Sequence, residues 1–274
     1  MAPTTTPDAL RPLEKAFQRH QRPQQAALIR AIPRLPVKPY ITSSTPMSTL
    51  EIEASQNVLL HQEKPWLHLR RIGELVQGRD RWLLCETRTG AISMLKQMSE
   101  DRGRAEFALL STLHHPSILH VDDSFCYNSQ FYLGYEYCRF TLEEVLCVPI
   151  KLGEDHIRYI AISIIAALEY MADHGIVHHR IDCQSIRVCG KSGKVFLSDF
   201  EKATLYRRQS LPNTDFEALG LVLIRTMNKN HLGQLDVNSV REQRRENKLY
   251  GIHDAEYWSH CKSLIDFLDD LFIN

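Results

Sequence analysis

The sequence predicts an α+β fold in which a strand-rich lobe comes before a helix-rich lobe. Apolar and β-branched runs separated by glycine fill the region from Trp66 to about Tyr137. Apolar residues then recur at three- and four-residue steps from Ile157 to Met171, which is typical of a helix with one buried face. With 274 residues, 43% hydrophobic and 24% charged, the chain is large enough to bury a core in both lobes.

The first lobe is expected to span about residues 66–137 and to combine strands with one helix. Short apolar runs bounded by glycine predict the strands. Apolar spacing predicts a helix from Phe107 to Leu113, which ends before Pro116 because the residue preceding a proline disfavours helical geometry. The expected strands are residues 67–72, 81–86, 91–96, 118–122 and 130–137.

The second lobe, about residues 138–274, is expected to be mainly helical. Residues 195–197 form a short apolar run that predicts a buried strand. Residues 241–248 mix charges of both signs, which predicts a helix that is either a solvated face or a docking surface. The other expected helices are residues 157–171, 216–227 and 264–271.

Residues 1–60 are predicted to be a largely disordered, basic tail. Seven of the 12 prolines lie in the first 39 residues, together with seven Lys or Arg and only two acidic residues. Prolines remove backbone donors and interrupt helices, so a packed core is not expected there. We favour a solvated tail; a partner-docking segment and a mitochondrial presequence are the alternatives.

Charge, cysteines and hydropathy exclude several classes of protein. The net charge is zero, from 33 basic and 33 acidic residues, so a nucleic-acid partner is not predicted. The seven cysteines contain no C-x-x-C pair and are odd in number, so neither a disulfide framework nor a structural zinc site is expected. No apolar run is long enough to span a membrane. An intracellular protein, cytoplasmic or nuclear, is the expectation.

The segment from Ile176 to Ile186 carries the most specific motif. It reads I-V-H-H-R-I-D-C-Q-S-I and aligns without a gap with the protein kinase catalytic loop, I-V-H-R-D-L-K-P-E-N-I. Over about residues 68–270 the chain therefore resembles the protein kinase family. The resemblance implies a two-lobed fold, with a small antiparallel sheet and a C helix in the first lobe and a larger helical second lobe, here truncated.

Further matches follow in the family's order. Their order is more specific than any single match, because an isolated lysine or D-F dipeptide is common. They are Ser93–Lys96 for V-A-I-K, Glu106 for the C-helix glutamate, residues 135–138 for the hinge, Asp199–Glu201 for D-F-G, and Asp215 with Gly220 for the D-x-x-x-x-G of the F helix. The structural spine implied by the resemblance comprises Leu110, His178, Phe200 and Asp215.

Arg180 holds the position of the catalytic aspartate. A guanidinium has five donors, no acceptor and a permanent charge, so it cannot accept a proton from a substrate hydroxyl, and it would repel metal ions. Ser185 replaces the metal-binding asparagine. Asp199 remains, either as a metal ligand or as a structural residue. Asp182 would supply a base only if the loop were rebuilt.

The nucleotide cleft departs from the family pattern too. Leu75 stands between Gly73 and Gly78 where the middle glycine is expected, and a side chain there obstructs close approach to phosphate. Glu201 replaces the glycine of D-F-G. Only 15 residues separate Asp199 from Asp215, with no A-P-E motif between them, so the activation segment is truncated. Bulky residues predict a filled adenine slot: Met94, Tyr135 and Arg187.

These departures predict a pseudokinase, not an enzyme, that acts in signalling as a scaffold or allosteric module and binds a protein partner such as an active kinase. No cofactor is expected, although weak binding of ATP and Mg²⁺ stays open. The alternatives are an unconventional kinase built on Lys96, Glu106 and Asp199, and a degenerate gene product. Lys96 and Glu106 are expected to pair, more as a structural clamp than for phosphate. The nucleotide-binding residues implied by the resemblance, now vestigial, are Gly73, Gly78, Lys96, Glu106, Glu136 and Tyr137.

Overall fold

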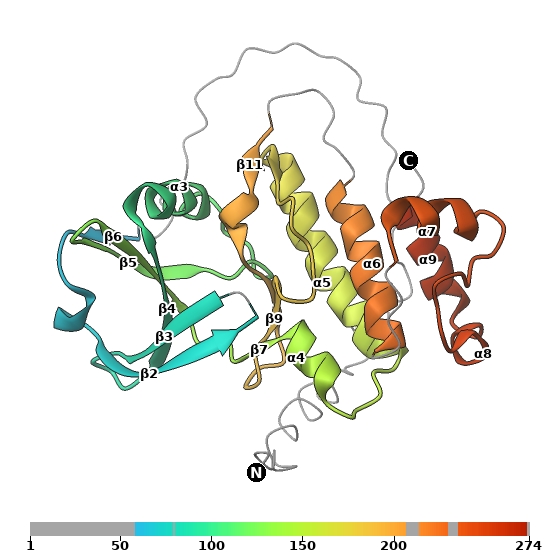
Figure 1. The fold of residues 1–274 in the computed structure, drawn as a ribbon, viewed down its shortest axis with the longest axis horizontal. Coiled ribbons are helices and arrows are strands. Elements are labelled where there is room, and N and C mark those ends of the chain that lie inside the picture. The colour runs from blue at the N-terminus through green and yellow to red at the C-terminus, as the bar shows by residue number, and fades with distance from the viewer. Residues whose placement is uncertain (1–57, 79, 207–213, 230–234, 273–274) are drawn as a thin grey trace.

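The computed structural model describes residues 58–78, 80–206, 214–229 and 235–272. Most of the predicted tail, residues 1–57, lies outside the described residues. The described chain forms two lobes: a sheet with one helix comes first, and a mainly helical lobe follows (Figure 1). This two-lobed α+β architecture confirms the predicted fold class.

A six-stranded sheet forms the first lobe, in the order β1-β5-β6-β4-β3-β2. Strand β1 runs parallel to β5, and the other neighbours are antiparallel. Helix α3 (Glu100–Leu110) lies close against the sheet at Gly103, where an added Cβ would meet the Phe131 ring at 2.2–2.5 Å. The strands are β1 (Leu60–His61), β2 (Arg70–Gln77), β3 (Asp80–Glu86), β4 (Ile92–Ser99), β5 (Val121–Tyr127) and β6 (Gln130–Glu136).

The boundaries of this lobe differ from the predicted ones in three places. The helix expected at residues 107–113 begins earlier and runs from Glu100 to Leu110. The sheet begins at Leu60, ahead of the predicted start at residue 66, because Leu60 and His61 pair with β5. The strand expected at residues 118–122 is centred further along, on Val121–Tyr127. Ile118 instead forms an isolated bridge with Leu197 in the second lobe. Apolar character alone did not distinguish a sheet strand from this buried connection.

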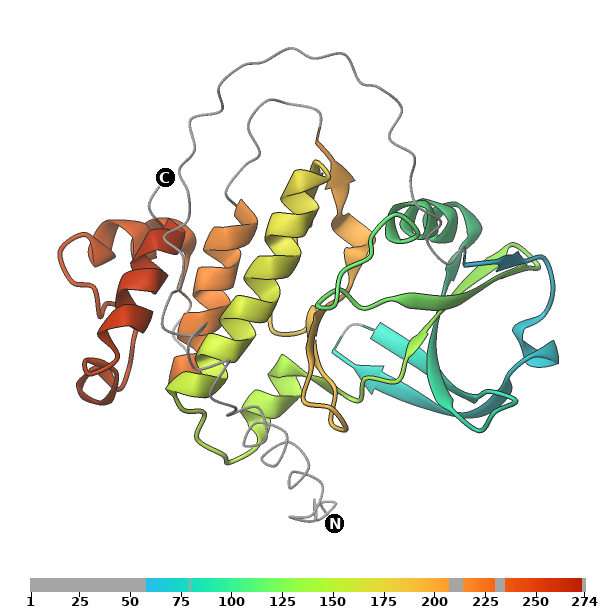
Figure 2. The same ribbon diagram turned by 180° about the vertical axis from the view of Figure 1, so that it is seen from behind.

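Helix α5 (Glu154–Asp173) runs through the second lobe, with α6 (Thr214–Asn228) beside it (Figure 2). Helix α9 (Lys262–Phe272) packs on α6, where Gly220 leaves room for the Phe272 ring. The remaining elements are η2 (Pro65–Leu67), β7 (Phe140–Thr141), α4 (Leu142–Cys147), β8 (Ile176–Val177), β9 (Ile186–Val188), β10 (Val195–Leu197), η3 (Phe200–Lys202), β11 (Thr204–Leu205), α7 (Val237–Arg244) and α8 (Ala255–Trp258).

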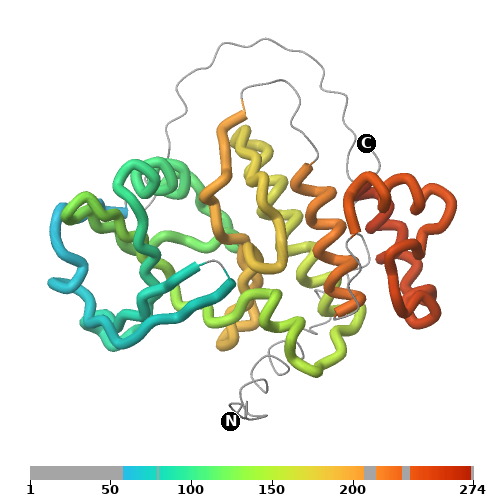
Figure 3. The backbone as a smooth tube through the Cα atoms, in the orientation of Figure 1, coloured from blue at the N-terminus to red at the C-terminus, as the bar shows by residue number. Residues whose placement is uncertain are grey.

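One continuous hydrophobic core extends from the inner face of the sheet through α5 and α6 to α9. The stretch from β8 to β11 crosses the front of this core between the lobes, as the backbone trace in Figure 3 shows. It holds the residues that the sequence motifs single out. Within the described residues, no helix is both long and apolar enough to cross a membrane.

Candidate functional site

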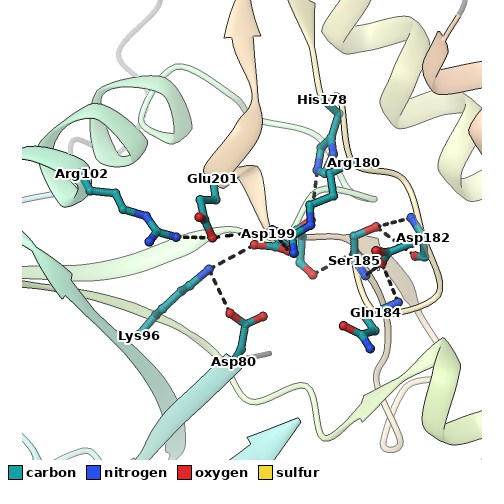
Figure 4. A network of polar contacts seen from close by, with 11 residues as sticks. Asp80, Lys96, Arg102, His178, Arg180, Asp182, Gln184, Ser185, Asp199 and Glu201 are labelled. Carbon is teal, nitrogen blue, oxygen red and sulfur yellow. Dashed lines mark hydrogen bonds and ion pairs between the residues drawn. The ribbon is translucent and has the colours of Figure 1, made fainter. Parts of the chain in front are cut away.

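Charged side chains from both lobes meet where β3 and β4 face the loop that follows β10 (Figure 4). Lys96 comes from β4 and Asp80 from the start of β3. Asp199 follows β10, in a left-handed backbone conformation with φ 67° that is uncommon for a residue other than glycine. Arg180 reaches the same point from the loop after β8. These four residues define the lobe-junction cluster.

Lys96 pairs with two aspartates. Its Nζ lies 3.2 Å from Asp199 Oδ1 and 3.5 Å from Asp80 Oδ1. Burial lowers the pKa of Lys96, but the charges of Glu106, Asp199 and Asp80 outweigh it and leave the pKa above its ordinary value. Within the described chain, the ion pairs of Lys96 therefore go to the aspartates. The expected Lys96–Glu106 ion pair is wrong, because the closer anions take the ammonium.

Glu106 is buried on α3, with Lys96 as the positive charge that acts most strongly on it. The Tyr135 hydroxyl donates to Glu106 Oε1 at 3.4 Å, while Oε2 has no hydrogen-bond partner among the described residues. Burial raises the pKa of Glu106, and the positive charge of Lys96 offsets this only in part. The charged form of Glu106 is therefore less favourable in the folded protein than in the unfolded chain.

We expect Glu106→Gln to raise the free energy of unfolding at pH 7 by about 1 kcal/mol. Because the folded-state pKa lies above the unfolded value, ionisation of Glu106 costs stability at high pH. That cost disappears as the pH falls below the unfolded pKa, so the gain should vanish in acid. Urea unfolding at several pH values measures this gain in stability, with Asp101→Asn at an exposed position of α3 as control. A loss of stability at pH 7 would contradict this assignment.

Arg180 acts as an internal cation at the junction. Its Nη1 lies 3.6 Å from Asp199 Oδ2 and 3.8 Å from Glu201 Oε2, and Glu201 also pairs with Arg102 of α3. Burial raises the pKa of Asp199, but Lys96 and then Arg180 oppose it, and the net effect is a lowered pKa. Arg180 thus supplies positive charge at the carboxylate that would face a metal ion.

Asp182 and Ser185 close their own turn. Asp182 Oδ1 accepts from the backbone N–H groups of Gln184 and Ser185, both at 2.8 Å. Ser185 Oγ in turn accepts from the Asp182 N–H at 3.0 Å. This carboxylate is committed to the turn, so it does not reach the lobe-junction cluster as a substitute base. The glycine-bearing turn also comes close here, since a Cβ added at Gly78 would lie 2.6 Å from Gln184 Oε1.

Arg187 fills the space beneath the first lobe. It comes from β9 and is only 1% exposed, with its guanidinium stacked 4.3 Å from the Trp82 ring. Its Nη1 donates to the backbone carbonyl of Cys138 at 2.9 Å and to Gln77 Oε1 at 3.1 Å. A flat, planar group that hydrogen-bonds the connector between the lobes has the shape and donors of a purine. The predicted filling of this slot agrees with the geometry.

The predicted spine residues come together. The rings of His178 and Phe200 meet edge to face at 4.9 Å, and His178 Nε2 donates to the Ser198 carbonyl at 3.0 Å. Asp215, at the start of α6, accepts from the backbone N–H groups of His178 at 2.6 Å and His179 at 2.9 Å. Leu110 is buried in the same core. The arrangement fixes the loop that carries Arg180.

Other predicted positions lie along the cleft without joining the cluster. Gly73 is in β2 with open space where a side chain would be, so nothing there requires glycine. Glu136 ends β6 and is exposed, and Tyr137 follows it in the connector. The sequence interpretation missed Asp80 and Trp82, which strand alternation places on one face of β3. It also missed Gln77 in β2 and Arg102 on α3, whose contacts come from other elements.

A two-lobed α+β domain with a lysine–aspartate pair at the lobe junction is of the protein-kinase type. The Protein kinase domain family matches residues 86–219 of this chain. The match covers just under half of the chain, which is similar to this family over those residues.

Among similar proteins, serine/threonine-protein kinase 36 of Pongo abelii is 33% identical over 35% of this chain and 7% of its own length. Protein kinase kin1 of Schizosaccharomyces pombe is 31% identical over 40% of this chain and 12% of its own length. Flippase kinase 1 of Saccharomyces cerevisiae is 27% identical over 48% of this chain and 16% of its own length. The chain thus spans a small part of each relative.

These relatives overturn one expectation from the sequence. The chain was predicted not to be an enzyme, on the strength of Arg180 and Ser185. The similar proteins are named serine/threonine-protein kinases, which points to an enzyme. The prediction was therefore wrong, because loss of a motif residue does not by itself establish loss of activity.

Proposed function

We propose that this chain is a regulatory member of the protein kinase-like superfamily that works by binding a protein partner, with only weak access of nucleotide to its cleft. The observation that carries this is Arg187, which occupies the slot under Trp82 and hydrogen-bonds the Cys138 carbonyl. Adenine would have to displace a buried side chain and its partners, which costs binding free energy.

The charged network supports the same role. Arg102, Glu201, Arg180, Asp199 and Lys96 form a continuous chain of ion pairs from α3 across the lobe junction to β4. Such a network holds the lobes together without ATP and Mg²⁺, so partner-binding surfaces on both lobes keep a fixed arrangement. A partner that is itself an active kinase fits this scaffold or allosteric role, and a cytoplasmic or nuclear location remains part of the proposal.

A second candidate is an unconventional protein kinase that uses ATP weakly. The retained contact between Lys96 and Asp199 favours it, since these side chains would face phosphate and metal. The names of the relatives, which are protein kinases, also favour this second candidate. Here Arg180 would have to move aside, or act on the transferred phosphate as a cation. Lys96 and Asp199 would hold the nucleotide and a single Mg²⁺.

Thermal unfolding with and without Mg²⁺-ATP separates the two. Our proposal expects stabilisation below about 0.4 kcal/mol at about 1 mM Mg²⁺-ATP, the value reached when ligand concentration equals Kd. A larger shift that disappears in Lys96→Met, together with transfer of labelled phosphate lost in the same variant, would establish the second candidate. Lys194→Met, on the turn between β9 and β10, is a matched control away from the cleft.

A further inference from the structure

Three potential metal ligands converge at the outer end of the first lobe, where β1 and η2 lie far from the lobe junction (Figure 1). They are His61, Glu63 and His68, and their ligand atoms all lie within 4.8 Å of one another. Glu63 Oε1 is 2.5 Å from His68 Nε2 and 3.9 Å from His61 Nδ1. No cysteine is involved, so cysteine spacing in the sequence gave no sign of this cluster.

The fold holds both imidazoles in place. His61 pairs with Phe125 across the β1–β5 ladder, and its ring stacks on the Phe125 ring at 5.1 Å and 25°. The His68 ring lies 5.7 Å from the same phenyl ring. Between them, η2 turns the chain back, with the His68 N–H donating to the Pro65 carbonyl at 3.0 Å. Phe125 is 1% exposed, so the two rings rest on a fixed core residue.

We propose that His61, Glu63 and His68 bind a zinc ion on the first lobe, as a three-ligand site with its remaining position open to water. Two imidazoles and one carboxylate are a donor set that suits zinc and chemically similar divalent ions, whereas Mg²⁺ and Ca²⁺ prefer oxygen alone. The side chains are 28%, 43% and 34% exposed, in chain order, which leaves the ion accessible from solvent.

Metal binding would replace the hydrogen bond between His68 and Glu63. In the structure one hydrogen bond joins the His68 ring to the Glu63 carboxylate. Zinc between them would take the lone pair of His68 Nε2 and one from Glu63 Oε1, and the neutral His68 imidazole would then carry its proton on Nδ1. Bonds of about 2.0–2.1 Å place ligand atoms about 3.3 Å apart in a tetrahedral site. Rotation of the half-exposed Glu63 side chain would supply this adjustment.

Bound zinc would cross-link two segments of the first lobe. It would join His61 in an edge strand to His68, seven residues later, and so fasten β1 against β5 next to the described start of the chain. This role is independent of the proposed function, since no residue of the lobe-junction cluster takes part.

Calorimetric titration of the full chain with ZnCl₂ in a buffer that does not bind metal tests the proposal. We expect one zinc per chain with Kd of about 1 μM or tighter and a higher Tm with zinc, but no such effects from MgCl₂. His61→Ala, His68→Ala and Glu63→Gln should each weaken binding at least tenfold, whereas His260→Ala, an exposed histidine of the second lobe, should not.

Glu63→Gln keeps the size of a half-exposed side chain, so it tests the ligand set even where His61→Ala fails to fold. Co²⁺ should give visible absorption in the wild type that is weakened in Glu63→Gln. Absence of zinc binding below about 100 μM would overturn the proposal, as would full affinity in all of the folded variants.

Discussion

We expect Asp215→Ala to lower the free energy of unfolding by about 3–5 kcal/mol. Asp215 is 7% exposed, and both of its carboxylate oxygens accept backbone hydrogen bonds, from His178 and His179. Alanine would leave two N–H groups without these acceptors in the interior. It would also release His179 from its left-handed conformation at φ 63°, which is unfavourable for a residue other than glycine.

Urea unfolding followed by circular dichroism measures this loss. Asp215→Asn keeps the shape but places a donor against one of the two N–H groups, so it should lose at least half as much stability. Asp270→Ala, at an exposed position of α9, should stay within about 0.5 kcal/mol of the wild type. A loss below about 1 kcal/mol in Asp215→Ala would mean that the histidine N–H groups find other acceptors.

The sequence predicted the elements whose signal is local. Apolar residues on one face anticipated α5, α6 and α9, because a helix must bury that face wherever it packs. The apolar run at residues 195–197 became β10. The family resemblance placed His178 and Asp215, although the hydrogen bonds between them join the loop to α6 and depend on tertiary packing.

The sequence could not settle which charges pair. Lys96 had Glu106, Asp199 and Asp80 within electrostatic reach, and tertiary placement, not spacing, brought the aspartates closest. The sequence showed Glu201 only as the replacement for the glycine of D-F-G, and its contacts with Arg102 and Arg180 come from other elements. Strand β1 was missed because two residues carry no periodic pattern.

Arg187 stacks on Trp82, a contact that could not be predicted from the sequence. Burial of the guanidinium lowers the pKa of Arg187, which reflects the cost of keeping this charge out of water. Arg187→Leu removes that cost but leaves the Cys138 carbonyl and Gln77 Oε1 without their donor. The two effects oppose each other, so we expect stability to change by less than about 2 kcal/mol.

Arg187→Leu should also raise the affinity for Mg²⁺-ATP at least tenfold, as calorimetric titration would measure. Leucine is shorter than arginine, so the face of the Trp82 ring and the Cys138 carbonyl would become available to a purine and its amino group. Arg187→Lys is the matched control, because lysine keeps a charge and a long stem in the slot and should leave binding weak.

Titration with adenosine would show which part of the cleft causes a gain in affinity. It carries the purine but no phosphate, so a gain for both ligands in Arg187→Leu would assign the obstruction to the slot under Trp82. No gain for either ligand in a folded variant would contradict the role given to Arg187 and would leave Met94 and Tyr135, both buried beside it, as the obstruction. A gain for Mg²⁺-ATP alone would place the effect at Lys96 and Asp199, because only these side chains would face the phosphates and the metal.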